Sequence, residues 1–190
     1  MVDTYDTKSD YKVVGNTPIR HDGLDKVTGR AIFGGDVKAP GLIWGDVLRS
    51  PHAHARIKSI DTSAAEAMDG VFAVLTHDDF PRAEDREIAA GEDTVNLRRD
   101  QSNVMADGKV HYKGHVVAAV AASDRNTAQE AANRIKVDYE VLPIVTDVDS
   151  AMADDAPIIL ESLVGDHLGE DVPNTNIARI FRHEFGDLDP

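Results

Sequence analysis

A run of small apolar residues near the middle of the chain constrains the fold more than any other feature. Residues 116–121 are all valine or alanine, with no polar residue among them. Such a run is typical of a strand that is buried on both faces, because a solvated face would carry alternating polar residues. We therefore expect this strand to lie at the centre of a sheet.

The clearest helix follows this strand, over residues 127–135, and Ser123 or Asp124 can cap its amino end. Its apolar residues recur at i, i+3, i+4 and i+7 and therefore share one face: Ala128, Ala131, Ala132 and Ile135. Residues 136–141 then alternate between apolar and charged side chains, which predicts a strand with one buried face. Strand, helix and strand together indicate a β–α–β unit.

A smaller unit of the same kind is predicted earlier in the chain. Oxygen-bearing side chains at 61–63 can cap a short helix over 64–68, which ends just before Gly70. Strands are predicted over residues 42–49, 55–60 and 71–76. The fold class is therefore α+β, with a short mixed sheet and two or three short helices.

The remaining segments lack strong periodicity. Residues 1–25 are polar and interrupted by glycine and proline, which predicts an extended amino-terminal arm. Residues 78–107 are rich in charge and indicate a surface excursion, whereas a short strand and turn are expected at 108–114. Beyond residue 147 we expect one short helix near 149–152 and then loops.

Charge and cysteine content exclude several functions. The formal charge of −14 would repel phosphate backbones and anionic lipids, so we expect neither a nucleic acid nor a membrane as partner. The sequence has no cysteine, which excludes disulfides, thiolate nucleophiles and iron–sulfur ligation by this chain. No basic, apolar leader and no apolar stretch of about 18 residues is present, and a cytoplasmic location is expected.

Two histidine pairs are the main candidates for chemistry. His52 and His54 would point to one side if their segment were extended, while His111 and His115 flank a predicted turn. A metal site needs at least a third ligand that neither pair supplies locally, so hydrogen bonding or interface packing is the favoured role. We assign no catalytic, cofactor-binding or metal-binding residue, and the candidates for structural or interface roles are His52, His54, Arg56, Gly114 and His115.

Several short segments carry further information through their residues and through their order along the chain. They are GRAIFGGD (29–36), APGL (39–42), LRSPHAHARI (48–57), SIDTS (59–63), GVFAVLT (70–76), GKVHY (108–112), GHVVAAV (114–120) and VDYEVLP (137–143). In this order they resemble the amino-terminal α/β-hammerhead domain of the large, molybdopterin-binding subunit in the xanthine dehydrogenase and aldehyde oxidase family. The sequence near residues 136–143 and 183–187 is also similar to that of 4-hydroxybenzoyl-CoA reductase large subunits, which belong to the same family.

The resemblance implies a division of the chain and a role for it. It assigns residues 26–150 to the hammerhead domain and residues 151–190 to a linker toward molybdopterin-binding domains. Members of the family insert an oxygen atom from water into an aldehyde or an aromatic ring, using molybdenum held by molybdopterin. Their electrons leave through [2Fe–2S] clusters and usually FAD, and the general base and the pterin-binding loops lie downstream of this region.

The expected function is therefore structural support and docking within an oxidoreductase. The expected partners are the remainder of the molybdopterin-binding subunit, an iron–sulfur subunit or domain, and a FAD subunit where one exists. Two alternatives stay open at this point. One is an independent acidic protein-binding module that uses the charged excursion, and the other is a metal-dependent enzyme built on the four histidines.

Overall fold

The structure is a computed structural model that describes residues 15, 17–91 and 93–186. The chain divides into two compact units, residues 1–42 and residues 43–190. The first unit contains helix α1 (Gly23–Val27) and a short 3-10 turn, η1 (Gly34–Asp36). Most of the predicted arm, residues 1–14 and 16, lies outside the described residues, as does the end of the predicted linker, residues 187–190.

The second unit contains a three-stranded antiparallel sheet with β7 (Val116–Ala122) at its centre. β1 (Trp44–Arg49) pairs along one edge of β7 and β3 (Val71–Thr76) along the other. Val117, Ala118 and Ala122 of β7 have no exposed surface. The prediction of a central, buried strand in this region is confirmed.

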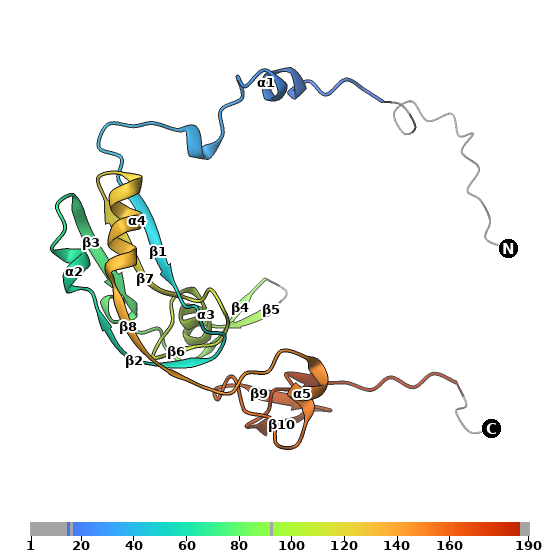
Figure 1. The fold of residues 1–190 in the computed structure, drawn as a ribbon. Coiled ribbons are helices and arrows are strands. Elements are labelled where there is room, and N and C mark those ends of the chain that lie inside the picture. Colours follow the sequence, from blue (N-terminus) through green and yellow to red (C-terminus); the bar gives the residue numbers. More distant parts are fainter. Residues whose placement is uncertain (1–14, 16, 92, 187–190) are drawn as a thin grey trace. The chain divides into compact units, whose positions relative to one another are not determined.

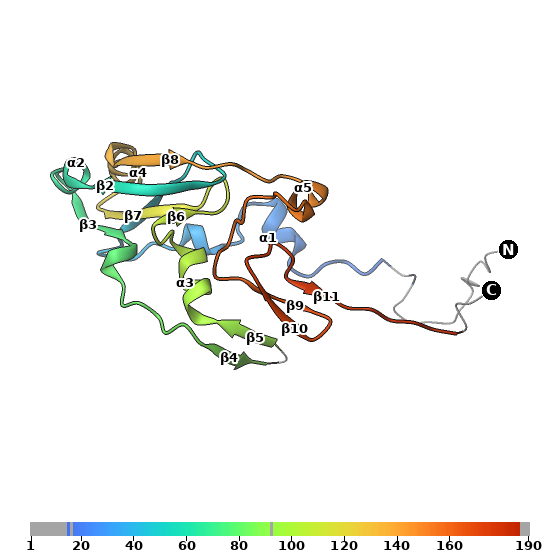
Figure 2. The ribbon, with the colours of Figure 1, turned by 90° about the horizontal axis from the view of Figure 1, so that it is seen from below.

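A second antiparallel sheet has the order β6–β2–β8, with β6 (Lys109–Val110) and β8 (Lys136–Val141) flanking β2 (Ala55–Asp61). Figure 2 shows β2 and β8 side by side, and their register places Arg56 opposite Glu140 and Ile60 opposite Val137. Ile60 and Val137 turn inward, where they contact the core beneath both sheets. The predicted strands at 55–60 and 136–141 are thus confirmed.

The prediction of two β–α–β units is wrong, because the two strands around each helix belong to different sheets. β2 and β3 are joined through α2 (Ser63–Glu66), a connection too short for the parallel crossover, which needs about a dozen residues. β7 and β8 are joined through α4 (Arg125–Arg134), yet β8 pairs with β2. The physical reason is that the apolar residues of β2 and β8, Ile57, Ile60, Val137 and Tyr139, pack together against the smaller core, which places the two strands in one sheet.

Helix α4 packs along the sheet of β1, β7 and β3 and forms the larger core (Figure 1). Asp124 caps it, since one carboxylate oxygen accepts hydrogen bonds from the backbone N–H groups of Asn126 and Thr127, at 3.0 Å each. The predicted apolar stripe is buried in full: Ala128, Ala131, Ala132 and Ile135. This helix is confirmed together with its cap.

The charged excursion contains more regular structure than the sequence indicated. It holds the short 3-10 turn η2 (His77–Asp79), the hairpin of β4 (Glu87–Ala90) and β5 (Asp93–Asn96), and helix α3 (Leu97–Val104). The Asn96 side chain caps α3 by accepting from the Arg99 N–H at 2.9 Å. No residue of α3 is buried, so the apolar periodicity that would have revealed this helix is absent from the sequence.

The predicted loops beyond residue 152 also form strands. After α5 (Val148–Met152), β9 (Val164–His167) pairs antiparallel with β10 (Glu170–Pro173) and parallel with β11 (Arg179–Ile180). A side chain at Gly165 would collide with the Ile177 carbonyl oxygen, so glycine permits this close approach. Strands of two to four residues carry too little periodicity to be recognised in a sequence.

Candidate functional site

The connection between β1 and β2 contains most of the candidate residues. Ser50 is buried, its N–H donates to the His115 carbonyl at 2.8 Å, and its own carbonyl accepts from the Gly114 N–H at 2.9 Å. Its hydroxyl bridges to the backbone of His52, at 3.0 Å in both directions. The chain bends over residues 51–54, so the extended segment that would align His52 and His54 on one side does not form.

His52 and His54 both contact the end of β8, by different means. The His52 ring packs edge-on against Tyr139, with ring centroids 5.1 Å apart. His54 is buried and donates from Nδ1 to the Pro143 carbonyl at 2.5 Å, while its carbonyl accepts from the Leu142 N–H at 3.0 Å. The two histidines therefore hold the β1–β2 connection against the strand that leaves the second sheet.

His115 is fully buried and uses both of its ring nitrogens. Nε2 donates to the Ser102 carbonyl at 2.8 Å, and Nδ1 accepts from the His111 N–H at 3.3 Å, which fixes the neutral tautomer. The ring stacks on Tyr112 with centroids 4.3 Å apart, and burial lowers the pKa of His115. This side chain joins the end of α3 to the start of β7 and has no lone pair free for a metal.

His111 lies beside His115, with ring centroids 5.8 Å apart, but makes no comparable bonds. Its Nδ1 atom is buried and has no hydrogen-bond partner among the described residues. Burial, and then the nearby charge of Lys109, lowers the pKa of His111 from 6.5 to about 4. The ring is therefore neutral at pH 7.

Gly114 and Arg56 have separate positions. Gly114 has a φ of +90°, which suits glycine, and its carbonyl accepts from Arg49 Nη1 at 2.9 Å. Arg56 lies on the solvent side of β2, where its Nε atom is 3.6 Å from a Glu140 carboxylate oxygen. Of the five candidates, the structure brings His52, His54, Gly114 and His115 to the β1–β2 connection and leaves Arg56 on an outer surface.

The sequence analysis did not predict two cavities that lie beside η2 and α3. The larger, of about 450 Å³, lies along β2 and η2, and within it His77 Nδ1 is 3.4 Å from Asp107 Oδ1. Its charged lining has more acids than bases: Glu66, Asp78, Asp79, Asp107, Lys58 and Arg82. The only sequence feature that marks this region is the spacing of Thr76 and Asp79. These two residues cap η2, because the Thr76 N–H donates to an Asp79 carboxylate oxygen at 2.7 Å.

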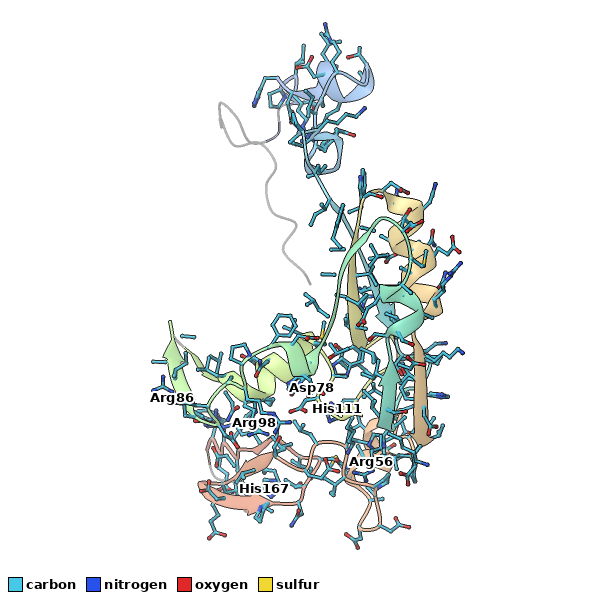
Figure 3. The ribbon with its side chains drawn as sticks, turned by 90° about the vertical axis from the view of Figure 1, so that its left-hand side faces the viewer. Arg56, Asp78, Arg86, Arg98, His111 and His167 are labelled. Carbon is cyan, nitrogen blue, oxygen red and sulfur yellow. The ribbon has the colours of Figure 1, made fainter. Side chains whose placement is uncertain are left out.

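The smaller cavity, of about 250 Å³, lies beside α3 and is lined by Arg98 and His111 (Figure 3). Lys109 also lines it and is nearly buried, but its ammonium group is paired with Glu161 at 2.7 Å. The other acids in the lining are Asp85 and Asp107. The positive charges of this cavity are therefore balanced by the chain's own carboxylates.

These features do not fit a metal or an anionic cofactor. Within the described residues, no group of three or more histidine, aspartate or glutamate side chains is arranged to hold a metal ion. The sequence lacks the cysteines that [2Fe–2S] clusters require. The acidic lining of the larger cavity would repel the phosphate of a pterin cofactor.

Comparison with known proteins then decides the family. Residues 28–143 match the family described as "Aldehyde oxidase and xanthine dehydrogenase, a/b hammerhead domain". This chain belongs to that family. The resemblance seen in the ordered sequence motifs, and the fold class that it implied, are thereby confirmed.

Relatives and solved structures agree with the hammerhead assignment. The carbon monoxide dehydrogenase large chain of Afipia carboxidovorans is 43% identical over 159 residues, which are 84% of this chain and 19% of that one. The nicotinate dehydrogenase large molybdopterin subunit of Eubacterium barkeri is 34% identical over 180 residues, 95% of this chain and 37% of that one. Quinoline 2-oxidoreductase from Pseudomonas putida 86 has a TM-score of 0.66 at 32% identity, covering 80% of this chain and 19% of that one.

The hammerhead chain thus spans about a fifth of the length of the carbon monoxide dehydrogenase large chain that it matches. In the solved structure of carbon monoxide dehydrogenase from Oligotropha carboxidovorans, the match covers 76% of this chain and 17% of that one, with a TM-score of 0.63 at 42% identity. Across the residues that the structure describes, no helix has the length and apolar character needed to cross a membrane.

Proposed function

We propose that this hammerhead domain is a structural and docking part of the large, molybdopterin-binding subunit of a molybdenum hydroxylase. The observation that carries the proposal is the use of the candidate histidines. In a chain of this family, His54 and His115 bind backbone carbonyl oxygens of their own domain. Residues 26–150 would form the hammerhead domain and residues 151–190 the linker that follows it.

The proposed enzyme hydroxylates an aldehyde or an electron-poor aromatic ring with oxygen from water. Molybdopterin-bound molybdenum would supply this chemistry, and [2Fe–2S] clusters with FAD would carry the electrons away. Support comes from relatives that are named for nicotinate, quinoline and aldehyde substrates. This chain's own part is to present a surface to the parts that hold these groups. Its sequence has no cysteine to ligate a [2Fe–2S] cluster, and the described residues contain no group of three or more side chains that could hold a metal ion.

The proposed partners are the rest of the large subunit, an iron–sulfur subunit or domain, and a FAD subunit. The relatives are subunits of larger enzymes, which supports partners of this kind. The proposal places the assembled enzyme in the cytoplasm, and fractionation of the cells that make it checks this part.

The direct test compares the 190-residue chain with the complex purified from the cells that make it. We expect molybdenum and dye-linked hydroxylase activity in the complex, and neither in the chain by itself. Turnover or stoichiometric molybdenum in the isolated chain would contradict the structural role. A histidine-based metal enzyme would instead show stoichiometric zinc, copper or iron after purification without a tag, yet His115 has no free ring nitrogen to contribute.

The salt dependence of partner binding distinguishes the docking role from the alternative, an independent acidic protein-binding module. Such a module would bind a basic partner through long-range attraction, so its affinity would fall steeply as the salt concentration rises. Docking within a permanent subunit through apolar contacts predicts little dependence on salt. Pull-down of the partners at low and at high salt distinguishes the two.

A further inference from the structure

The sheet of β1, β7 and β3 has two faces, and only one of them is covered within the second unit. α4 and α2 pack on the face that carries Leu48, Ala118 and Val120. Figure 3 shows α4 on one side of this sheet. Among residues 43–91 and 93–186, the elements that pack closely on these strands are α2, α4 and η2.

The opposite face consists of two rows of residues that lie directly across the three strands. One row pairs Val47, Ala119 and Leu75, and the other pairs Gly45, Ala121 and Ala73. We call these six residues the apolar face. Leu75 is 38% exposed, Gly45 and Ala73 are exposed, and the other three are half-buried.

The apolar face begins where the smaller core ends. Val117 points to the same side of β7 as Ala119 and Ala121, but it is fully buried against Val110 and Ala55. From Ala119 onward, nothing of comparable size covers this side of the strand in the described part of the second unit. The apolar face is therefore continuous with the smaller core but is not covered by other elements of the described second unit.

A solvated sheet face normally alternates with polar residues, and the second sheet shows this pattern. Its outer face carries Arg56, Lys136, Asp138 and Glu140. On the first sheet, by contrast, six adjacent positions have no polar side chain. This pattern is typical of a surface that is buried from water in the assembled protein. The chain is strongly acidic, at −14, yet none of its charge falls on these six positions.

We propose that the apolar face is the docking surface for the remaining polypeptide of the large subunit, which covers it with large aliphatic or aromatic side chains. The inference rests on the proposed function. Relatives contain this domain as 19% and 37% of a longer chain, so most of their subunit lies outside it and is available to cover an apolar surface. Apolar contact is typical of permanent interfaces, in contrast to the more polar surfaces of transient ones.

The small residues of the apolar face define what can cover it. Four of the six are glycine or alanine, so a neighbouring element can approach the backbone of β7 closely. A side-chain carbon at Gly45 would find only the Val120 carbonyl oxygen, at 3.7 Å, and its φ is not in the left-handed region. Large side chains from the docked polypeptide would fill this flat centre, which Val47 and Leu75 border.

The experiment places one positive charge on each of the two sheets in the full-length subunit of the assembled enzyme. Ala73→Arg puts it on the apolar face, and Ser59→Arg is the matched control on the solvent face of β2, opposite Asp138. Both positions are exposed in strands, so neither variant should disturb the domain itself, which the thermal midpoint of the 190-residue chain checks. Gly45→Arg provides a second, independent test of the same face.

We expect Ala73→Arg and Gly45→Arg to lower the yield of assembled, molybdenum-containing enzyme by roughly tenfold or more, because a charge buried without a partner strongly opposes docking. Ser59→Arg should assemble normally. The proposal is overturned if Ala73→Arg assembles as well as the control. It is also overturned if the isolated chain forms a dimer that Ala73→Arg abolishes while enzyme assembly is unchanged, since a second copy would then be the occupant.

The outcome for the unsubstituted protein separates this inference from the proposed function. If the unsubstituted complex contains no molybdenum and no hydroxylase activity, the proposed function itself is wrong. If it contains both, and the two variants of the apolar face still assemble normally, only the docking surface is wrong.

Discussion

The outer faces of the two three-stranded sheets differ completely in charge. The face of the β6–β2–β8 sheet carries Arg56, Lys136, Asp138 and Glu140, whereas the apolar face of the β1–β7–β3 sheet has no polar side chain. Both faces are open to solvent in the described second unit. Charge on alternate strand positions therefore marks the face that water covers, and its absence marks the face that another part of the protein covers.

The largest expected effect comes from substituting two residues on the same side of β7, one in the smaller core and one on the apolar face. Val117→Asp places a carboxylate in the smaller core and should lower the free energy of unfolding by about 4 kcal/mol or more. Ala121→Asp places it on the open apolar face, where we expect a loss of about 1 kcal/mol or less. Urea unfolding of the 190-residue chain measures both, and equal losses would show that the face is already covered in the isolated chain.

A second prediction concerns His115, the histidine that joins the end of α3 to the start of β7. His115→Ala removes a fully buried ring and leaves the Ser102 carbonyl and the His111 N–H without partners, so we expect a loss of about 3 kcal/mol. His115→Gln can keep one of the two bonds and should lose less. The same denaturation experiment measures both variants, and an Ala variant as stable as the parent chain would mean that His115 does not hold α3 against the start of β7.

The pH dependence of stability should follow the buried histidines. The pKa of His111 is lowered to about 4 in the folded chain, so between pH 4 and pH 6.5 the unfolded chain binds more protons. Stability is therefore complete above pH 6.5 and should fall by roughly 1–2 kcal/mol as the pH decreases to 4, after allowance for partial solvent screening. His115, whose pKa burial also lowers, acts in the same direction.

The control for this prediction is an exposed histidine. His111→Asn should flatten the loss of stability at low pH, whereas His21→Asn, at an exposed position, should leave it unchanged. Urea midpoints measured at intervals between pH 4 and pH 7 test the difference. Identical pH profiles for the two variants would contradict the assignment to His111.

The smallest effect is expected on the charged face. Arg56 and Glu140 are each about half exposed and 3.6 Å apart, so Glu140→Gln should change stability by no more than about 0.5 kcal/mol. Salt at about 1 M should remove even this difference, because it screens exposed charges. A loss above about 1 kcal/mol would mean that this face, too, is a structural contact.

Local sequence patterns predicted those helices and strands that bury a regularly spaced set of apolar side chains. The apolar run of β7 and the alanine stripe of α4 were recognisable because each repeats with the period of its own secondary structure. Helix α3 and the β9–β10 hairpin were missed because α3 buries no residue and the hairpin strands are only four residues long. Of the candidate residues, His115 is buried and binds the Ser102 carbonyl and the His111 N–H, and neither partner could be inferred from the sequence.

The sequence by itself determined the strand and helix positions of the central region, the family, and the absence of thiolate ligands, since these depend on local periodicity, motif order and composition. Only the tertiary structure decided that β2 pairs with β8 and β1 with β7, and that His54 and His115 bind distant carbonyl oxygens. It also decided which side of β7 is left open. Strand pairing and burial depend on contacts between residues far apart in the chain, and no local pattern records those contacts.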